Sequence, residues 1–163
     1  MDNAAVPPKG NTITQLSDLL KLSRAELDDL FKQNLPGPIP SGDSTGLAIA
    51  CSGTVWARIL ARFAKTWAWQ GKVFTPNPDG NGATLENKLT IAGVKGIVAR
   101  VYYTKSWLDG KECIVLDYSK TSLLARKIRD EIRLINPSLK IYLGKVWWGQ
   151  TRLIDFALQF PRP

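Results

Sequence analysis

The chain has 163 residues, a formal net charge of +8 and 44% apolar residues. This is enough to bury one hydrophobic core without help from metals or disulfides. Histidine is absent, which excludes the Ser–His and Cys–His catalytic pairs and most zinc and haem ligand sets. Cys51 and Cys113 do not indicate a disulfide framework, so we expect two free thiols. We expect neither a metal nor a cofactor.

Two features bear on location and partners. No apolar run approaches the ~20 residues of a membrane-spanning helix, and the N-terminus lacks the basic and then apolar order of a secretory signal. We therefore predict a cytoplasmic protein. Its basic character favours anionic partners, such as a carboxylate ligand, a phospholipid surface or nucleic acid, although scattered lysines more often form a solvated face.

The first 40 residues predict a tail, a helical segment and a strap. Residues 1–12 are expected to be a flexible tail, and residues 13–40 a helical N-terminal segment that ends in a Pro-rich strap. Within that segment Thr14–Leu22 has a short helical pattern. Ser23 and Glu26 form a capping box before a second helix, which ends near Asn34. The Pro-Gly-Pro sequence that follows cannot be helical.

Residues 41–163 predict the main domain. A helix is expected over Val55–Trp67. After it, the spacing of the apolar residues changes to the alternation that is typical of strands. Asp109-Gly110 predicts a β-hairpin with a type I′ turn, in which both central residues have positive φ. The predicted strands are Trp69–Phe74, Leu85–Ile91, Gly96–Thr104, Glu112–Tyr118, Lys140–Trp147 and Arg152–Phe160.

A further helix is predicted over Thr121–Ile135, because Leu124, Ile128, Ile132 and Ile135 form an apolar stripe. The short turns between the other elements favour an antiparallel meander over a βαβ sheet. We therefore predict an α+β protein. Its core would be an antiparallel β-barrel or strongly curved sheet of about six strands, with N-terminal helices and one inserted helix.

The aromatic residues suggest a ligand pocket. Six tryptophans and four tyrosines are many for a chain of this length, and such side chains combine apolar area with one polar tip. The alternative is a large aromatic core. The candidate walls of a ligand site are Tyr102, Trp107, Tyr142, Trp147 and Phe156.

Charges within the predicted strands supply the candidate polar groups. Arg100 and Asp117 are expected to pair across neighbouring strands, since a charge inside an apolar barrel needs a partner. The pair is either structural or a site in which Arg100 anchors a ligand carboxylate. Asp117, with Tyr118 beside it, is also the candidate general base. A register shift of one residue would turn Arg100 and Asp117 outward.

The inserted helix carries a cluster of bases: Arg126, Lys127, Arg129 and Arg133. They could contact an anionic membrane. Nucleic acid is disfavoured, because Asp130 and Glu131 dilute the cluster and no recognition pattern is present.

The order of elements resembles lipocalin-like (calycin-type) barrels and small bacterial proteins with a Trp/Gly/Lys motif before such a barrel. The resemblance covers roughly residues 67–160. It is carried by Trp69–Phe74, by the hairpin strands Val98–Tyr103 and Cys113–Tyr118, and by Tyr142–Gly144 and Leu153–Leu158. It implies an internal cavity for a hydrophobic small molecule, such as a fatty acid, terpenoid or polyketide.

Three functions follow as hypotheses. The first is binding of a hydrophobic small molecule. If this ligand carries a negative charge, Arg100 would be its anchor. The second is a cofactor-independent cyclase or isomerase acting on such a ligand in the same cavity. The third is a membrane-surface or interaction module that uses the basic helix.

Overall fold

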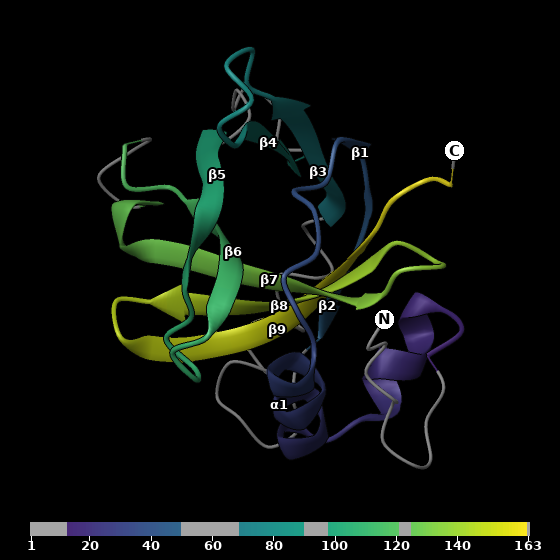
Figure 1. Cartoon of the computed structure of the whole chain (residues 1–163). Helices are drawn as coiled ribbons and strands as arrows, with labels where there is room; N and C mark the ends of the chain where they lie inside the picture. Colours follow the sequence, from purple (N-terminus) through teal and green to yellow (C-terminus); the bar gives the residue numbers. More distant parts are fainter. Residues whose placement is uncertain (1–12, 50–68, 90–97, 121–124, 163) are drawn as a thin grey trace, which may run out of the picture.

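The computed structural model describes residues 13–49, 69–89, 98–120 and 125–162, and its strands form one antiparallel sheet that curls into a nearly closed barrel (Figure 1). The strands are β1 (Gly42–Asp43), β2 (Thr45–Ile49), β3 (Trp69–Pro76), β4 (Ala83–Leu89), β5 (Val98–Lys105), β6 (Glu112–Asp117), β7 (Ile128–Asn136), β8 (Ile141–Trp148) and β9 (Thr151–Gln159). The helices are the 3-10 helices η1 (Leu16–Lys21) and η2 (Ala125–Lys127) and the α-helix α1 (Arg24–Gln33). The predicted tail at 1–12 and the predicted helix Val55–Trp67 lie outside the described residues.

The predicted α+β barrel is confirmed. Neighbours in the sheet follow the order β1-β3-β4-β5-β6-β7-β8-β9-β2, so β3 to β9 form a meander. The described residues hold nine strands, three more than predicted. Two of these, β1 and β2, come from Gly42–Ile49, where glycines and short polar side chains look like a loop in the sequence.

Ser44, between β1 and β2, closes the barrel. β1 pairs with β3, and β2 pairs with β9, so this short segment joins the two edges of the meander. The Ser44 amide and hydroxyl donate to the Lys72 carbonyl at 3.0 and 2.7 Å, and the hydroxyl accepts from the Lys72 amide at 2.9 Å. Gly71 makes the approach possible, because a Cβ there would lie 2.0 Å from the Ser44 carbonyl oxygen.

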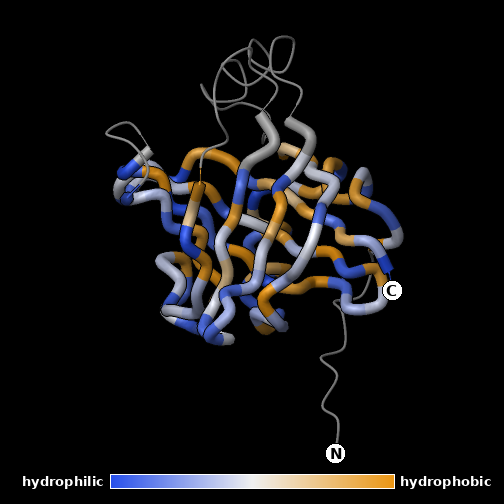
Figure 2. Tube along the Cα trace, turned by 90° about the horizontal axis from the view of Figure 1, so that it is seen from above, coloured by the Kyte–Doolittle hydropathy of each residue, from blue (hydrophilic) through white to orange (hydrophobic). Residues whose placement is uncertain are grey.

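The sheet buries apolar side chains on both faces. Successive side chains of a strand point to opposite faces, and Figure 2 shows hydrophobic residues along much of the sheet. In β6 four consecutive residues are buried, so both faces of this strand are covered. The interior core gathers Phe74, Leu85, Val101, Leu116, Ile132 and Leu158 from six strands. The outer face of β6 to β9 forms a second core with the N-terminal helices, which includes Leu19, Leu27, Phe31, Cys113 and Leu143.

Helix α1 begins at the predicted capping box. The Ser23 hydroxyl accepts from the Glu26 amide at 3.3 Å, and the Glu26 carboxylate accepts from the Ser23 amide at 2.8 Å. The helix lies against the outer face of the sheet (Figure 1). Its Asp28 carboxylate binds the ammonium of the fully buried Lys145 at 2.9 Å. Burial, opposed by the nearby Asp155 carboxylate, lowers the pKa of Lys145.

The Pro-rich segment between α1 and β1, residues 35–41, is called the strap here. It crosses one end of the barrel. The Tyr103 hydroxyl on β5 donates to the Gly37 carbonyl at 3.0 Å, and the Tyr142 hydroxyl on β8 donates to the Pro38 carbonyl at 2.8 Å. The Leu134 amide on β7 donates to the Leu35 carbonyl at 3.2 Å. Because one segment binds three separate strands, it covers that end of the interior.

Residues 121–124 of the predicted helix Thr121–Ile135 lie outside the described residues. Over the rest the prediction is wrong, because Ile128–Asn136 forms strand β7. Ile128 and Ile132 are four residues apart, a spacing that places them on one face of a helix and also on one face of a strand. In the strand they face the interior. The charges of Arg129, Glu131 and Arg133 alternate with them on the outer face.

These outer charges bind the loop of the β5–β6 hairpin. Glu131, which is fully buried, accepts from the Ser106 hydroxyl at 2.6 Å and from the Trp107 amide at 2.8 Å. The Arg133 guanidinium binds the two Asp109 oxygens at 2.7 and 2.8 Å. The hairpin is therefore confirmed, but its type I′ turn is wrong: Gly110 has a φ of +71°, whereas Asp109 does not have positive φ. Asp109 faces Arg133 in a wider loop.

We expect Asp109→Asn to destabilise the protein by roughly 3 kcal/mol at neutral pH, because it leaves the buried Arg133 without its carboxylate. The hydrogen bonds from Arg133 lower the pKa of Asp109, against the effect of burial. This stability is present above the unfolded pKa of about 4 and is lost as the pH falls through the folded value. Urea unfolding from pH 7 to pH 3 measures both effects. The exposed Asp29→Asn is the control, and equal losses in the two variants would contradict the assignment.

Candidate functional site

A polar cluster of Lys72, Tyr118 and Asp130 lies inside the barrel. The Lys72 ammonium is 2.8 Å from Asp130 Oδ2 and 2.5 Å from the Tyr118 hydroxyl. The Tyr118 hydroxyl donates to the same Asp130 oxygen at 3.1 Å. All three residues are buried, and the side chains of Lys72 and Asp130 are each 5% exposed.

Three strands place these side chains on the inner face. Lys72 shares the inner face of β3 with Phe74. Tyr118 directly follows β6 and continues the inward series of Ile114 and Leu116. Asp130 lies between Ile128 and Ile132 on the inner face of β7. The cluster is thus surrounded by the interior core, at the half of the barrel remote from the strap.

Aromatic rings border the cluster. The Lys72 ammonium lies 5.2 Å from the centre of the Tyr118 ring and 5.3 Å from that of Phe156, distances at which a cation is attracted to the ring face. Phe156 lies over Gly144 on β8, where a Cβ would be 2.2 Å from the ring. The absence of a side chain at Gly144 therefore allows the Phe156 ring to pack directly against the β8 backbone.

Asp130 leaves one oxygen without a partner. Its Oδ1 atom is buried and has no hydrogen bond within the part of the chain that the structure describes. A buried acceptor without a donor costs roughly 1–3 kcal/mol. A buried ion pair also adds little net stability, because desolvation of the charges offsets their attraction. The cluster is therefore better suited to holding a polar group of a ligand, or to moving a proton, than to stabilising the fold.

The predicted Arg100–Asp117 pair forms, but it lies on the outer face. The Arg100 guanidinium is 3.1 Å from Asp117 Oδ2, and its side chain is 55% exposed. The Tyr102 hydroxyl donates to the same oxygen at 3.2 Å. Burial raises the pKa of Asp117, but hydrogen bonds from Ser119, Arg100 and Tyr102 outweigh it, and the net pKa is lowered. The predicted interior position of this pair is therefore wrong. Val101 and Leu116, the neighbours of Arg100 and Asp117 along their strands, point inward, so Arg100 and Asp117 point outward.

The remaining predicted residues divide between the two faces. Trp107 and Trp147 lie outside, where their rings meet edge to face at 5.8 Å. Tyr118, Tyr142 and Phe156 lie inside. Tyr142 is at the strap, and burial with the nearby Tyr103 raises its pKa to about 12. The structure therefore brings only Tyr118 and Phe156 to the polar cluster.

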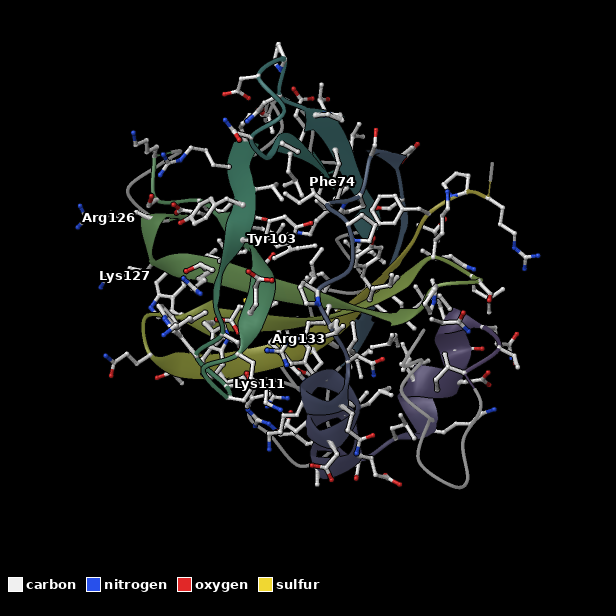
Figure 3. The ribbon with its side chains drawn as sticks, viewed as in Figure 1. Phe74, Tyr103, Lys111, Arg126, Lys127 and Arg133 are labelled. Carbon is white, nitrogen blue, oxygen red and sulfur yellow. The ribbon has the colours of Figure 1, made fainter. Side chains whose placement is uncertain are left out.

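The four predicted bases are also separated. Figure 3 shows Arg126 and Lys127 projecting away from the barrel, and both are exposed. Arg133 is fully buried against Asp109 and the Phe31 carbonyl. Arg129 stacks on Trp107 at 4.4 Å and binds Glu131. A basic patch of four side chains does not form.

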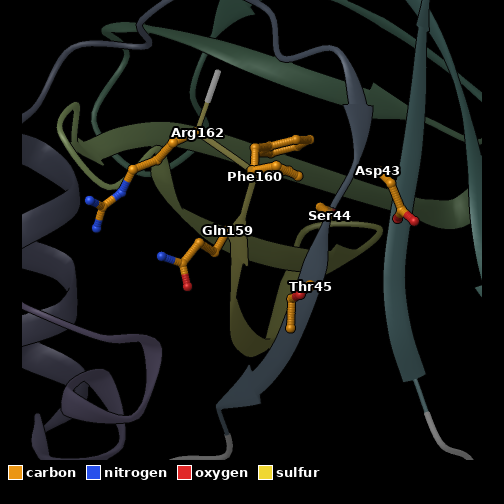
Figure 4. A pocket seen from close by; sticks show the side chains of 7 residues that line it. Asp43, Ser44, Thr45, Gln159, Phe160 and Arg162 are labelled. Carbon is orange, nitrogen blue, oxygen red and sulfur yellow. The ribbon is translucent and has the colours of Figure 1, made fainter.

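The barrel also carries a polar groove on its surface. A groove of about 540 Å³ lies at the seam of the barrel between β2 and the end of β9 (Figure 4). Its lining is mainly polar, with Ser44, Gln159 and Arg162 among the side chains. Among the described residues there is no cluster of metal-ligating side chains and no helix long and apolar enough to cross a membrane.

Sequence reasoning missed Lys72 and Asp130. Lys72 could have been found from the alternation of β3, since it is two residues from the apolar Phe74. Asp130 was hidden by the predicted helix, in which it only diluted the basic residues. With β7 assigned as a strand, an aspartate between Ile128 and Ile132 is a charge in an apolar core and calls for a partner.

We expect Lys72→Met to destabilise the protein by roughly 3–5 kcal/mol, because it leaves the Asp130 carboxylate buried and unpaired. The double variant Lys72→Met/Asp130→Leu should recover most of this loss, since apolar side chains of similar size can replace a buried ion pair. Urea unfolding measures all three proteins, with the exposed Lys111→Met as control. A double variant as unstable as the single one would show that the fold itself depends on the cluster.

Comparisons with known proteins support the fold alone. No family model matches the sequence. No curated protein matches it either. A solved structure, that of a protein from Thermomonospora curvata, is similar with a TM-score of 0.55 and 19% sequence identity, over 86% of this chain and 89% of that one. At this identity the similarity supports the barrel fold and carries no function to this chain.

Proposed function

We propose that the barrel binds a hydrophobic small molecule, whose polar group contacts the cluster of Lys72, Tyr118 and Asp130. The observation that supports this best is the buried Asp130 Oδ1, which has no hydrogen-bond partner among the residues that the structure describes and lies beside an apolar core. Binding sites for small molecules commonly combine apolar walls with a few convergent polar groups. The aromatic wall next to the cluster is Phe156, not the outward Tyr102, Trp107 or Trp147.

The strap bears on how such a ligand would lie. Residues 35–41 bind Tyr103 and Tyr142 across one end of the barrel, and the cluster lies toward the other end. The polar group of the ligand would therefore lie remote from the strap, and its apolar part would lie along the interior core.

The enzymatic alternative would use the same cluster. Tyr118 is held between an ammonium and a carboxylate, so its hydroxyl is placed to donate or accept a proton. Asp117 does not suit the role of interior base, since it lies on the outer face and its pKa is lowered. Cyclisation or isomerisation by this protein would thus depend on Tyr118.

Binding can be tested with decan-1-ol, decanoic acid and farnesol by native mass spectrometry and calorimetry. We expect at least one compound to bind with 1:1 stoichiometry. Lys72→Met/Asp130→Leu should weaken that binding by about tenfold, the effect of losing one buried hydrogen bond. Arg100→Ala/Asp117→Ala removes a charge pair from the outer face and serves as the control. Equal weakening in both double variants, or no binding to the native protein, would contradict the proposal.

A second candidate function is contact with an anionic membrane surface. Arg126 and Lys127 are exposed, and the Gly149 amide donates to the Lys127 carbonyl at 2.8 Å, which places the turn after the exposed Trp148 beside them. Trp107, which is 48% exposed, stacks on Arg129. Tryptophan next to lysine and arginine is typical of surfaces that lie at a lipid headgroup region.

For this second function we expect the protein to co-sediment with phosphatidylcholine vesicles that contain phosphatidylserine, and not with pure phosphatidylcholine. Arg126→Glu/Lys127→Glu should abolish the difference, because each base near an anionic surface contributes about 1 kcal/mol. Lys32→Glu on α1 is the matched control. Binding that persists at 1 M salt, where charges are screened beyond roughly 3 Å, would contradict an electrostatic contact.

A further inference from the structure

The two oxygens of the Asp130 carboxylate have different surroundings. Oδ2 accepts from the Lys72 ammonium at 2.8 Å and from the Tyr118 hydroxyl at 3.1 Å. Oδ1 is buried but has no hydrogen-bond partner within the described residues. An ionised carboxylate only accepts hydrogen bonds. The unsatisfied Oδ1 therefore calls for a hydrogen-bond donor.

The charges of the cluster point to a neutral ligand. Lys72 and Asp130 carry opposite charges 2.8 Å apart and cancel each other. The Lys72 ammonium is already engaged by Asp130 and Tyr118. An anionic ligand needs a hydrogen-bond donor, but at this position it would meet the carboxylate oxygen Oδ1, which is an acceptor. The anion would also lose its hydration in an apolar interior.

Among neutral donors, a hydroxyl suits this position best. A hydroxyl has one O–H group to donate, and its oxygen can accept a hydrogen bond in turn. A primary amide would bring two donors and a carbonyl, each of which needs a partner once it is buried. A second donor would find only one free carboxylate oxygen.

We infer that the ligand is a neutral, mainly apolar alcohol whose hydroxyl donates a hydrogen bond to Asp130 Oδ1. This inference rests on the proposed function. It narrows the ligand class, because it selects an apolar alcohol, such as a terpenoid or long-chain alcohol, and disfavours a free fatty acid. It also gives Asp130 the recognition role that the sequence had suggested for Arg100.

The test compares two carbon skeletons, decyl and farnesyl, each as the alcohol, the methyl ether and the carboxylic acid. Dissociation constants are measured by calorimetry at pH 7 on the native protein. We expect the alcohol to bind at least about tenfold more tightly than its methyl ether, because the ether leaves Oδ1 unpaired. The acid should also bind at least about tenfold more weakly than the alcohol.

Two variants connect this preference to the proposed atom. Asp130→Asn keeps the size of the side chain but supplies an amide that can donate as well as accept, so the alcohol-to-ether ratio should fall toward one. Asp117→Asn makes the same change on the outer face and should keep the native ratio. A change in selectivity is a result that loss of stability alone would not produce.

Each outcome decides between the two proposals. An acid that binds more tightly than its alcohol would overturn the inference and leave the proposed function standing. An alcohol and an ether that bind equally would also overturn it, since Oδ1 is then satisfied by water. If none of the six compounds binds the native protein, both proposals fail.

Discussion

Strand β7 buries charge on both of its faces, and the surrounding elements are arranged to neutralise that charge. Inside the barrel Asp130 is met by Lys72 from β3 and by Tyr118 after β6. Outside, Glu131 and Arg133 hold the β5–β6 loop, and Arg133 also donates to a carbonyl of α1. A buried charge without a partner costs several kcal/mol. The loop, the helix and the strand β3 are therefore all fixed with respect to β7.

Closure of the barrel supports the same cluster. The hydrogen bonds of Ser44 attach the segment between β1 and β2 to the backbone of Lys72 on β3, and β2 pairs with β9 at the other edge of the meander. Lys72 therefore belongs both to the seam and to the polar cluster. At the opposite end the strap binds Tyr103 and Tyr142. A change at Gly71 would disturb Ser44 by direct collision. It would thereby move the Lys72 backbone, and the ammonium would lose its fixed position between Asp130 and Tyr118.

The functional proposal depends on a distinction between two of the charge pairs that the barrel carries, Arg100–Asp117 and Lys72–Asp130. Arg100 and Asp117 form an outer pair that is open to water, and such pairs contribute little. Lys72 and Asp130 form an inner pair in an apolar core, with a buried oxygen left over. Of these two pairs, the inner one alone gives a ligand a desolvated acceptor of fixed geometry, which water does not already provide.

Much of the architecture follows from the sequence alone, because local signals determine it. The capping box sets the start of α1, the Pro-Gly-Pro segment excludes a helix, and the alternation of Phe156, Leu158 and Phe160 predicts the last strand. The pairing of Arg100 with Asp117 was also predicted, because opposite charges on neighbouring strands need partners, and the wider loop around Asp109-Gly110 sets the register that brings them together. These features depend on residues that are close in sequence.

Other features were decided only by tertiary structure. The apolar spacing of Ile128 and Ile132 fits a helix and a strand equally, and pairing with β6 and β8 selects the strand. Which face of β5 and β6 points inward depends on how the whole sheet curls, so Arg100 and Asp117 could not be placed from their own strands. Lys72 and Asp130 are 58 residues apart. No local signal joins them, because their contact exists only once the barrel has closed and neither charge can remain buried without the other.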